Sequence, residues 1–264
     1  MLLSIITINY NESSSLLETL NSIRIQNYKA IQLIVIDGGS TDQSLEVIQN
    51  NLDIITFYLS EKDDGIYDAM NKGINFATGD FLLFLNSGDE LCSDESLNSV
   101  IDKIDDKDAV YFSRAQNTYL KKDMWVFPQL SVNNDNVISW LKENQPNHQT
   151  ILFPKSFYYT EKYKLKYKIG SDLDYKLRAL KSYRFIFINE IFIKFKLGGY
   201  SSNLNSFIFV VKIVKEIISI NIENNNFSLI RTMKTIINYF IKYVSSRIMP
   251  EDKFFKTLAF LKKS

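Results

Sequence analysis

The feature that most constrains the fold is a fourfold alternation in the first hundred residues. Four short apolar runs, each bounded by turn residues, alternate with segments whose apolar residues have helical spacing. The runs cover residues 2–8, 31–37, 54–60 and 81–85. Because they are apolar on both faces, they predict an α/β fold, in which a mainly parallel sheet is flanked by helices.

Each apolar run ends in a polar cluster. In chain order the clusters are NYNE, DGGSTD, SEKDDG and NSGD, and three of them contain aspartate. In parallel sheets, ligands bind beyond the carboxyl ends of the strands. Four polar strand ends that converge on one edge of the sheet therefore predict a binding site there.

The first of these clusters limits the nucleotide chemistry. A dinucleotide-binding turn needs glycines that let the backbone approach a pyrophosphate, and NYNESSS contains none. A Walker A motif is absent as well. We therefore expect a divalent cation, Mn²⁺ or Mg²⁺, held by carboxylate and bridging to substrate phosphates.

The composition is that of a globular protein of one large domain, or one domain with an appendage. Of the 264 residues, 45% are hydrophobic and 23% are charged. The single cysteine argues for a reducing compartment. The first residues lack the basic start and cleavage site of a signal peptide, and no apolar run reaches the length of a spanning helix. We expect a cytoplasmic protein.

Residues 200–264 differ from the rest in charge. They carry 10 Lys or Arg against 4 Asp or Glu, whereas residues 1–199 carry 21 against 26. Helical patterns at 206–222 and 228–247 combine apolar stripes with basic residues, separated by an asparagine run. Such helices suit the inner face of a membrane with anionic lipid. Packing on the domain or a homodimer contact is the alternative.

The second half has weaker patterns. They indicate strands at 108–113, 149–153 and 184–197, the last as one strand or two, and helices at 136–142 and 171–181. Earlier in the chain, Ser40 and Gln43 have capping-box spacing at the start of a helix, and Ser93 is positioned to cap the next one.

Several motifs in fixed order carry a family resemblance. SIITINYNE, VIDGGSTD, SEKDDGIYDAMNKGINFATGD and FLLFLNSGDEL resemble the donor-binding half of glycosyltransferase family 2, the inverting enzymes with a GT-A fold. SEKDDGIYDAMNKG and LNSGD also resemble the branch that builds bacterial O-antigen, capsule and colanic acid. The resemblance fades after Gly199.

The resemblance implies a domain organisation and an activity. Residues 1–199 would form a Rossmann-like GT-A domain, with a donor half up to about 113 and an acceptor half from 114, followed by a basic amphipathic helical tail at 200–264. The enzyme would transfer a hexosyl or N-acetylhexosaminyl group from a UDP-sugar to a lipid-linked surface polysaccharide. Nucleic acid is not an expected partner.

The resemblance also implies roles at matching positions. NSGD takes the place of the family's Asp-x-Asp motif, and since Asn86 and Gly88 are uncharged, Asp89 would be the metal ligand. The residues implied in donor binding are Thr7, Asn9, Glu12, Asp37, Asp63, Asp68, Asn71, Lys72, Asn86 and Ser87.

The stretch KIGSDLDYKLRAL resembles the family's Glu-Asp motif, which introduces the catalytic base. On that alignment Asp172 is the base, and a helix cap is the structural alternative. Asp174 is the second candidate, but an ion pair with Arg178 four residues later would make it structural. His148, the single histidine, and Gln149 would contact acceptor or diphosphate, unless His148 is only a packed side chain.

Two other functions compete with glycosyl transfer. A nucleotidyltransferase that makes sugar nucleotides usually has a glycine-rich basic loop after its first strand, which NYNESSS does not provide. A non-catalytic assembly or binding protein on the same fold is the other, and the presence together of Asp37, Asp89 and Asp172 argues against it.

Overall fold

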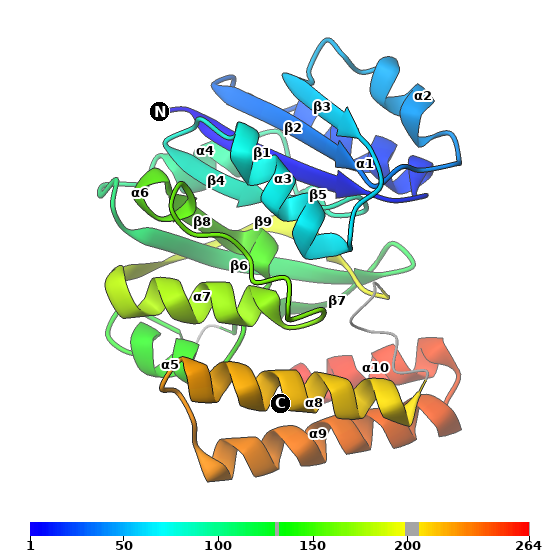
Figure 1. The fold of residues 1–264 in the computed structure, drawn as a ribbon, viewed down its shortest axis with the longest axis vertical. Helices are drawn as coiled ribbons and strands as arrows, with labels where there is room; N and C mark the ends of the chain where they lie inside the picture. The colour runs from blue at the N-terminus through cyan, green and yellow to red at the C-terminus, as the bar shows by residue number, and fades with distance from the viewer. Residues whose placement is uncertain (130–131, 199–205, 264) are drawn as a thin grey trace.

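A nine-stranded sheet forms the centre of the molecule in the computed structural model, which describes residues 1–129, 132–198 and 206–263 (Figure 1). Its order is β3-β2-β1-β4-β8-β6-β9-β5, and β7 pairs with β6. The strands are β1 (Leu3–Asn9), β2 (Ile31–Asp37), β3 (Phe57–Ser60), β4 (Phe81–Phe84), β5 (Glu90–Leu91), β6 (Val110–Tyr119), β7 (Lys122–Phe127), β8 (Ile151–Pro154) and β9 (Phe185–Lys196).

Helices cover both faces of this sheet, and a separate group of helices follows it along the chain. They are α1 (Ser13–Arg24), α2 (Ser44–Gln49), α3 (Ile66–Phe76), α4 (Ser96–Ile101), α5 (Val137–Glu143), α6 (Lys155–Tyr158), α7 (Ser171–Ser182), α8 (Phe207–Glu223), α9 (Leu229–Ile248) and α10 (Glu251–Lys263), with a short 3₁₀ turn, η1 (His148–Thr150).

The predicted parallel sheet of the first half is confirmed. β1 pairs in parallel with β2 and β4, and β2 pairs in parallel with β3. Alternate residues of β1 face opposite cores: Ile6 packs with α3 and α7, whereas Ile5 packs with α1 and α4. Because successive side chains of a strand point to opposite faces, these apolar runs require helices on both sides.

The second half adds strands of mixed direction. β8 is antiparallel to both β4 and β6, and β9 runs parallel to β6. Residues 184–197 form a single strand, β9. The strand predicted at 108–113 extends to Tyr119 and turns into β7, a hairpin that the sequence patterns did not indicate. The short β5 pairs antiparallel with β9, with Glu90 opposite Lys194.

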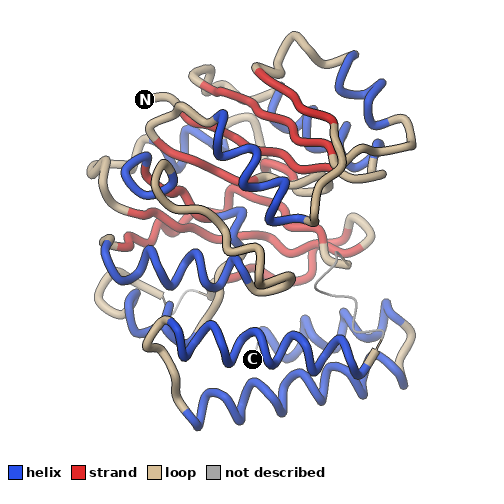
Figure 2. The backbone as a smooth tube through the Cα atoms, viewed as in Figure 1, coloured by secondary structure: helices blue, strands red, loops and turns tan. Residues whose placement is uncertain are grey.

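The C-terminal helices form a layer below α7 in Figures 1 and 2. The predicted helices α8 and α9 are confirmed, and α10 is an additional helix. Ile220 of α8 is buried against Tyr167 and Leu177, which joins this layer to the domain. The predicted boundary near 199 lies outside the described residues. Among the described residues, no helix combines the length and apolarity needed to cross a membrane.

Candidate active site

The neighbouring strands β2, β1 and β4 place a hydrogen-bonded group of polar side chains at their carboxyl ends. Asn9 ends β1 and Asp37 ends β2, and their register pairs the two residues directly. Asn9 donates from Nδ2 to Asp37 Oδ1 at 2.9 Å, and Ser87, just after β4, donates from Oγ to Asn9 Oδ1 at 2.9 Å. The structure therefore brings these three predicted donor residues together.

Asp37 is fully buried and organises this end of the sheet. It accepts hydrogen bonds from Asn9, from the Ser40 amide at 2.9 Å and hydroxyl at 2.5 Å, and from the Ser60 hydroxyl at 2.7 Å. Burial raises the pKa of Asp37, but these hydrogen bonds outweigh it and bring the pKa below its ordinary value. The donor contact predicted for Asp37 stays a prediction.

The capping role predicted for Ser40 is wrong. Helix α2 begins at Ser44, and its first amide is bound by Asp42, which accepts from the Ser44 backbone at 3.0 Å. Ser40 bonds to Asp37 instead. The reason is that the DGGSTD segment first turns around the buried Asp37 carboxylate before the helix starts. The capping role predicted for Ser93 is wrong as well, because the N-cap of α4 is Glu95.

The loop between β3 and α3 closes on this group of side chains. A Cβ on Gly38 would lie only 2.6 Å from Asp63 Oδ2, so the Asp63 carboxylate closely approaches the backbone at Gly38. Asp68 and Lys72 form an ion pair at 3.5 Å, and Lys72 also pairs with Glu61 at 2.8 Å. These charges line the outer side of α3.

The other predicted donor residues have mixed surroundings. Asn71 binds the backbone of Tyr163 with both ends of its amide, at 2.9 Å and 2.8 Å, which ties α3 to the second half of the chain. Thr7 is buried, and its hydroxyl has no hydrogen-bond partner in the described part of the chain. Glu12 is exposed and accepts from the Ser15 hydroxyl at 2.7 Å.

A second group of side chains joins the two halves. Asn86, after β4, lies with Nδ2 3.2 Å from His148 Nε2. His148 Nδ1 lies 3.9 Å from Asp172 Oδ2, and the Tyr67 hydroxyl donates to Asp172 Oδ1 at 3.2 Å. The predicted base, the histidine and the residue at the start of the Asp-x-Asp position therefore lie side by side.

Electrostatics favour a neutral imidazole in this group. Burial lowers the pKa of His148, and the charge of Asp172 opposes that effect without cancelling it. With the Asn86 amide donating to Nε2, the ring proton lies on Nδ1, on the side of Asp172. His148 thus connects the carboxyl end of β4 to Asp172.

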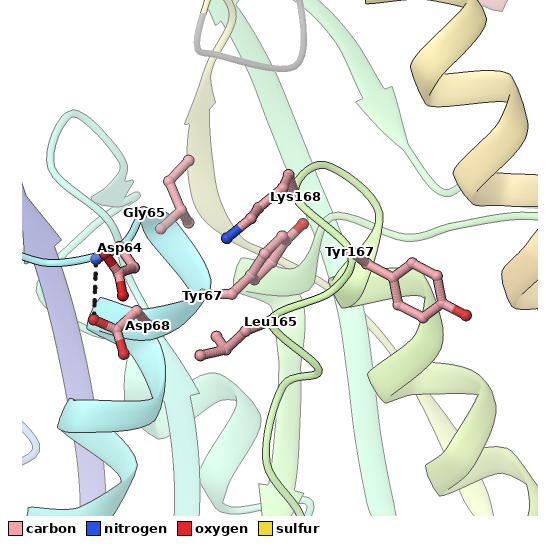
Figure 3. A pocket seen from close by; sticks show the side chains of 8 residues that line it. Asp64, Gly65, Tyr67, Asp68, Leu165, Tyr167 and Lys168 are labelled. Atoms are coloured by element: carbon pink, nitrogen blue, oxygen red, sulfur yellow. Dashed lines mark hydrogen bonds between the residues drawn. The ribbon is translucent and has the colours of Figure 1, made fainter.

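A shallow pocket borders this group between the start of α3 and the loop before α7 (Figure 3). Tyr67 and Lys168 line it from these two elements, and the Asp64 amide donates to Asp68 Oδ2 at 3.1 Å on its other side. The single hydrogen of the Tyr67 hydroxyl is shared between Asp172 Oδ1 and the Ile169 carbonyl, which lies 2.6 Å from the Tyr67 oxygen. Tyr67 thus connects the pocket to Asp172.

Asp89 is enclosed by its own chain. Its side chain and backbone together are 4% exposed, and its carboxylate accepts from Gln149 Nε2 at 2.8 Å and from the Lys196 amide at 3.0 Å. Burial raises the pKa of Asp89 to about 7, against the lowering effect of these two hydrogen bonds. Gln149 therefore contacts Asp89 in this structure.

These residues do not fit a divalent cation held by the protein. Magnesium and manganese need oxygen ligands, preferably carboxylates. Asn86 and Gly88 bring no charge, both oxygens of Asp89 are bound, and the described residues contain no group of three or more His, Cys, Asp or Glu suited to a metal. The arrangement does not support Asp89 as metal ligand, which stays a prediction of the resemblance.

Asp174 is not part of this group. It is fully buried on α7, where it accepts from Lys164 at 3.1 Å, from Arg178 at 2.8 Å and from Asn224 of the α8 end at 2.9 Å. The predicted ion pair with Arg178 is confirmed. Asp174 has no free oxygen for acceptor or diphosphate here, because all its contacts fasten α7 to α8 and to the preceding loop.

Sequence patterns missed several residues of the site. Ser60 and Tyr67 lie within predicted motifs but were not singled out, although a serine and a tyrosine beside aspartates were available signals. Lys196 is the most distant omission: its amide meets Asp89 across 107 residues. No local pattern predicts that contact, since it depends on the pairing of β5 with β9.

Comparison with known proteins places the chain in a family. The family model of glycosyl transferase family 2 matches residues 4–174, and the chain belongs to this family. An uncharacterized glycosyltransferase of Mycobacterium tuberculosis is 38% identical over 108 residues, which are 40% of this chain and 41% of that protein. The matched part therefore spans about two fifths of the length of that relative.

A second relative matches over a longer stretch. A PGL/p-HBAD biosynthesis glycosyltransferase of Mycobacterium bovis is 29% identical over 186 residues, which are 68% of this chain and 70% of that protein.

Solved structures share the fold at low identity. S. aureus TarS 1–349 in complex with UDP-GlcNAc superposes with a TM-score of 0.70 at 17% identity, covering 98% of this chain and 79% of that one. The mannosyltransferase PcManGT of Pyrobaculum calidifontis, in complex with GDP-Man and Mn²⁺, gives 0.60 at 12% identity, covering 99% and 80%. The predicted GT-A fold is confirmed.

Proposed function

We propose that this chain is an inverting glycosyltransferase that moves a sugar from a nucleotide-diphosphate sugar, with uracil as the base, to a hydroxyl group of an acceptor. Three findings support the proposal: the family, the polar group at the ends of β1, β2 and β4, and a carboxylate from the acceptor half beside it. A solved neighbour of the same fold binds UDP-GlcNAc.

The position of Asp172 is the observation that carries this proposal. Its Oδ1 accepts from the Tyr67 hydroxyl at 3.2 Å and from the Leu173 amide at 2.9 Å, which fixes the carboxylate. Its Oδ2 lies 3.9 Å from His148 Nδ1, beyond hydrogen-bond distance. Oδ2 is therefore available to accept the proton of an acceptor hydroxyl.

The reaction follows from this geometry. The acceptor oxygen attacks the anomeric carbon, its proton passes to Asp172 Oδ2, and the bond between the sugar and the diphosphate breaks with its electron pair on the phosphate oxygen. A single base suffices for inversion, whereas a retaining double displacement needs a second, nucleophilic carboxylate. These steps use the side chains of this chain alone, because the residues at the site do not fit a divalent cation held by the protein.

Replacing Asp172 by Asn tests the proposal. The variant keeps the size of the side chain but cannot take a proton, so turnover should fall by roughly 10²–10⁴-fold. Donor affinity should stay unchanged, because the base acts on the acceptor. Single-turnover transfer and calorimetric donor titration measure the two effects. An Asp172→Asn enzyme with normal turnover would refute the role of this residue.

The helical tail supports a finer proposal about the acceptor. α9, which the structure describes throughout, has no buried residue. Its exposed apolar side chains recur at helical spacing, and Lys234 and Arg247 are exposed on the same helix. The apolar set is Leu229, Ile230, Met233, Ile236, Ile237, Phe240, Ile241 and Ile248.

Apolar and basic side chains together suit an anionic lipid surface. We therefore infer that α9 places the enzyme on such a surface, where it would act on a lipid-linked polysaccharide acceptor of the O-antigen or capsule type. A second copy of the chain is the competing occupant of this face.

A further inference from the structure

Lys196 lies at the position where an Asp-x-Asp motif would present its second carboxylate. The register of β5 and β9 sets Glu90 opposite Lys194 and Leu91 opposite Ile193. Continued by two residues, this antiparallel register sets Gly88 opposite Lys196. A Cβ on Gly88 would meet Lys196 Cδ at 2.8 Å and Nζ at 3.5 Å. The Lys196 side chain therefore occupies the side-chain space of position 88, and its ammonium group lies beside it.

The backbone of Lys196 is held by hydrogen bonding, whereas its side chain is exposed. Its amide donates to Asp89 Oδ1 at 3.0 Å, and Asp89 is held in turn by Gln149. The residue itself is exposed. Its Nζ donates to the Ser15 hydroxyl at 2.8 Å, which donates on to Glu12. In the described part of the chain, Lys196 makes no ion pair within 4.0 Å.

The neighbourhood of this ammonium group is the donor end of the sheet. Gly88 directly follows Ser87, which bonds to Asn9, and it lies two residues after Asn86, which contacts His148. The Gly88 amide donates to Thr19 Oγ1 at 2.9 Å and to the Ser15 carbonyl at 3.2 Å, which fixes the turn beside α1. The turn has a positive φ of 94° at Gly88, a conformation that favours glycine.

We propose that the Lys196 ammonium binds the diphosphate of the nucleotide-sugar donor and stabilises the charge that develops when the sugar leaves. The proposal rests on the glycosyltransferase function proposed above. It assigns to a lysine the task that a carboxylate-bound cation performs at an Asp-x-Asp motif. When the bond between the anomeric carbon and the phosphate oxygen breaks, the electron pair remains on that oxygen, and the fixed cation lowers its energy.

The residue types at the site agree with this substitution. A metal ion held by two carboxylates presents its positive charge to the diphosphate. A lysine ammonium group presents a positive charge there without any carboxylate. Here Asn86 and Gly88 have no carboxylate. The carboxylate of Asp89 accepts a hydrogen bond from the Lys196 amide. Asp89 would thus be a positioning residue for Lys196. A lysine ammonium is a compact cation suited to phosphate.

The test measures binding to the full chain in EDTA, so that no divalent cation contributes. UDP and GDP are titrated calorimetrically, with uridine and guanosine as probes without phosphate. Lys196→Met removes the charge at nearly constant length, and Lys196→Arg keeps it. Lys194→Met, two residues earlier on β9, is the matched control. Thermal unfolding verifies that each variant is folded.

The wild type should bind one nucleoside diphosphate in EDTA. Lys196→Met should weaken that binding by roughly 10- to 100-fold, the value of a charge-assisted hydrogen bond, and leave nucleoside binding unchanged. Lys196→Arg and Lys194→Met should bind within a few-fold of the wild type.

Two results would overturn the proposal. Binding that requires Mn²⁺ and is equal in the wild type and Lys196→Met would show that a metal, and not Lys196, holds the diphosphate; the glycosyltransferase function would then stand. If neither nucleoside diphosphate binds with or without Mn²⁺, the proposed function fails, and this inference fails with it.

Discussion

Replacing Asp89 by Asn should make the protein more stable at neutral and alkaline pH, which is unusual for a buried residue with two hydrogen bonds. The folded protein raises the pKa of Asp89 to about 7 from an ordinary value of 3.8, chiefly through burial. Each pKa unit corresponds to about 1.4 kcal/mol, so ionising this buried carboxyl costs about 4 kcal/mol.

The sign of the pH dependence follows from proton linkage. Between the two pKa values, 3.8 unfolded and about 7 folded, the folded protein keeps the proton that the unfolded chain has lost. Stability therefore declines as the pH rises through this range, and the full cost applies above it. An asparagine is neutral in both states and removes this decline.

Gln149 makes the substitution sterically and chemically acceptable. Its Nε2 donates to Asp89 Oδ2 at 2.8 Å, whereas its Oε1 is buried without a partner in the described part of the chain. When the Gln149 side-chain amide rotates by half a turn, its Oε1 faces residue 89. In the variant, Oε1 then accepts a hydrogen bond from the asparagine side-chain amide. In the wild type, it accepts one from the protonated Asp89 carboxyl. The other oxygen of the wild-type carboxyl, or the one oxygen of the asparagine, still accepts from the Lys196 amide.

Urea unfolding at pH 5 and pH 8 measures the effect. Asp89→Asn should be more stable than the wild type at pH 8 by up to about 4 kcal/mol and should lose the decline between the two pH values. Asp102→Asn, which replaces an exposed carboxylate, is the control. If the wild type and Asp89→Asn show the same change between pH 5 and pH 8, the carboxyl is ionised throughout and the reasoning is wrong.

Two further predictions concern α7 and α9. Asp174→Asn should lower the free energy of unfolding by about 3 kcal/mol without changing donor affinity, because it leaves Arg178 and Lys164 without their buried carboxylate partner. Urea unfolding and donor titration of the variant check this. An unaltered stability would contradict it. The double variant Ile237→Asp, Phe240→Asp should no longer sediment with phosphatidylglycerol liposomes. The control Leu120→Asp, at an exposed apolar residue outside α9, should still sediment. The proposal that α9 binds a lipid surface would be refuted by a wild-type protein that fails to sediment, or by a dimer that the double variant dissociates.

The sequence by itself determined the first half of the fold. Its four apolar runs predicted the strands near β1 to β4, because a short apolar run bounded by turn residues is typical of a strand. The polar strand ends predicted one site at one edge, since parallel strands present their carboxyl ends together. Asp172 and its helix were placed by a local motif, and α7 begins at the residue before it.

The tertiary structure alone decided which polar groups are free to act. Asp89 follows a turn and Asp172 lies in the first turn of α7, yet the first is enclosed by Gln149 and β9 and the second keeps one open oxygen. Nothing within a few residues of either distinguishes them. The distinction comes from chain segments that arrive from elsewhere in the sheet, and hydrophobic periodicity carries no information about which strands become neighbours.

Lys196 shows the same limit most clearly. It ends a strand whose apolar pattern predicted only that β9 is buried, and its position opposite Gly88 depends on the short β5, whose two residues are too few for any pattern. The β6–β7 hairpin was missed for a related reason, because the strand ends beside its turn are half-exposed or exposed. Local sequence fixes the period of an element, whereas the order and register of a sheet are set by packing between segments distant in the chain.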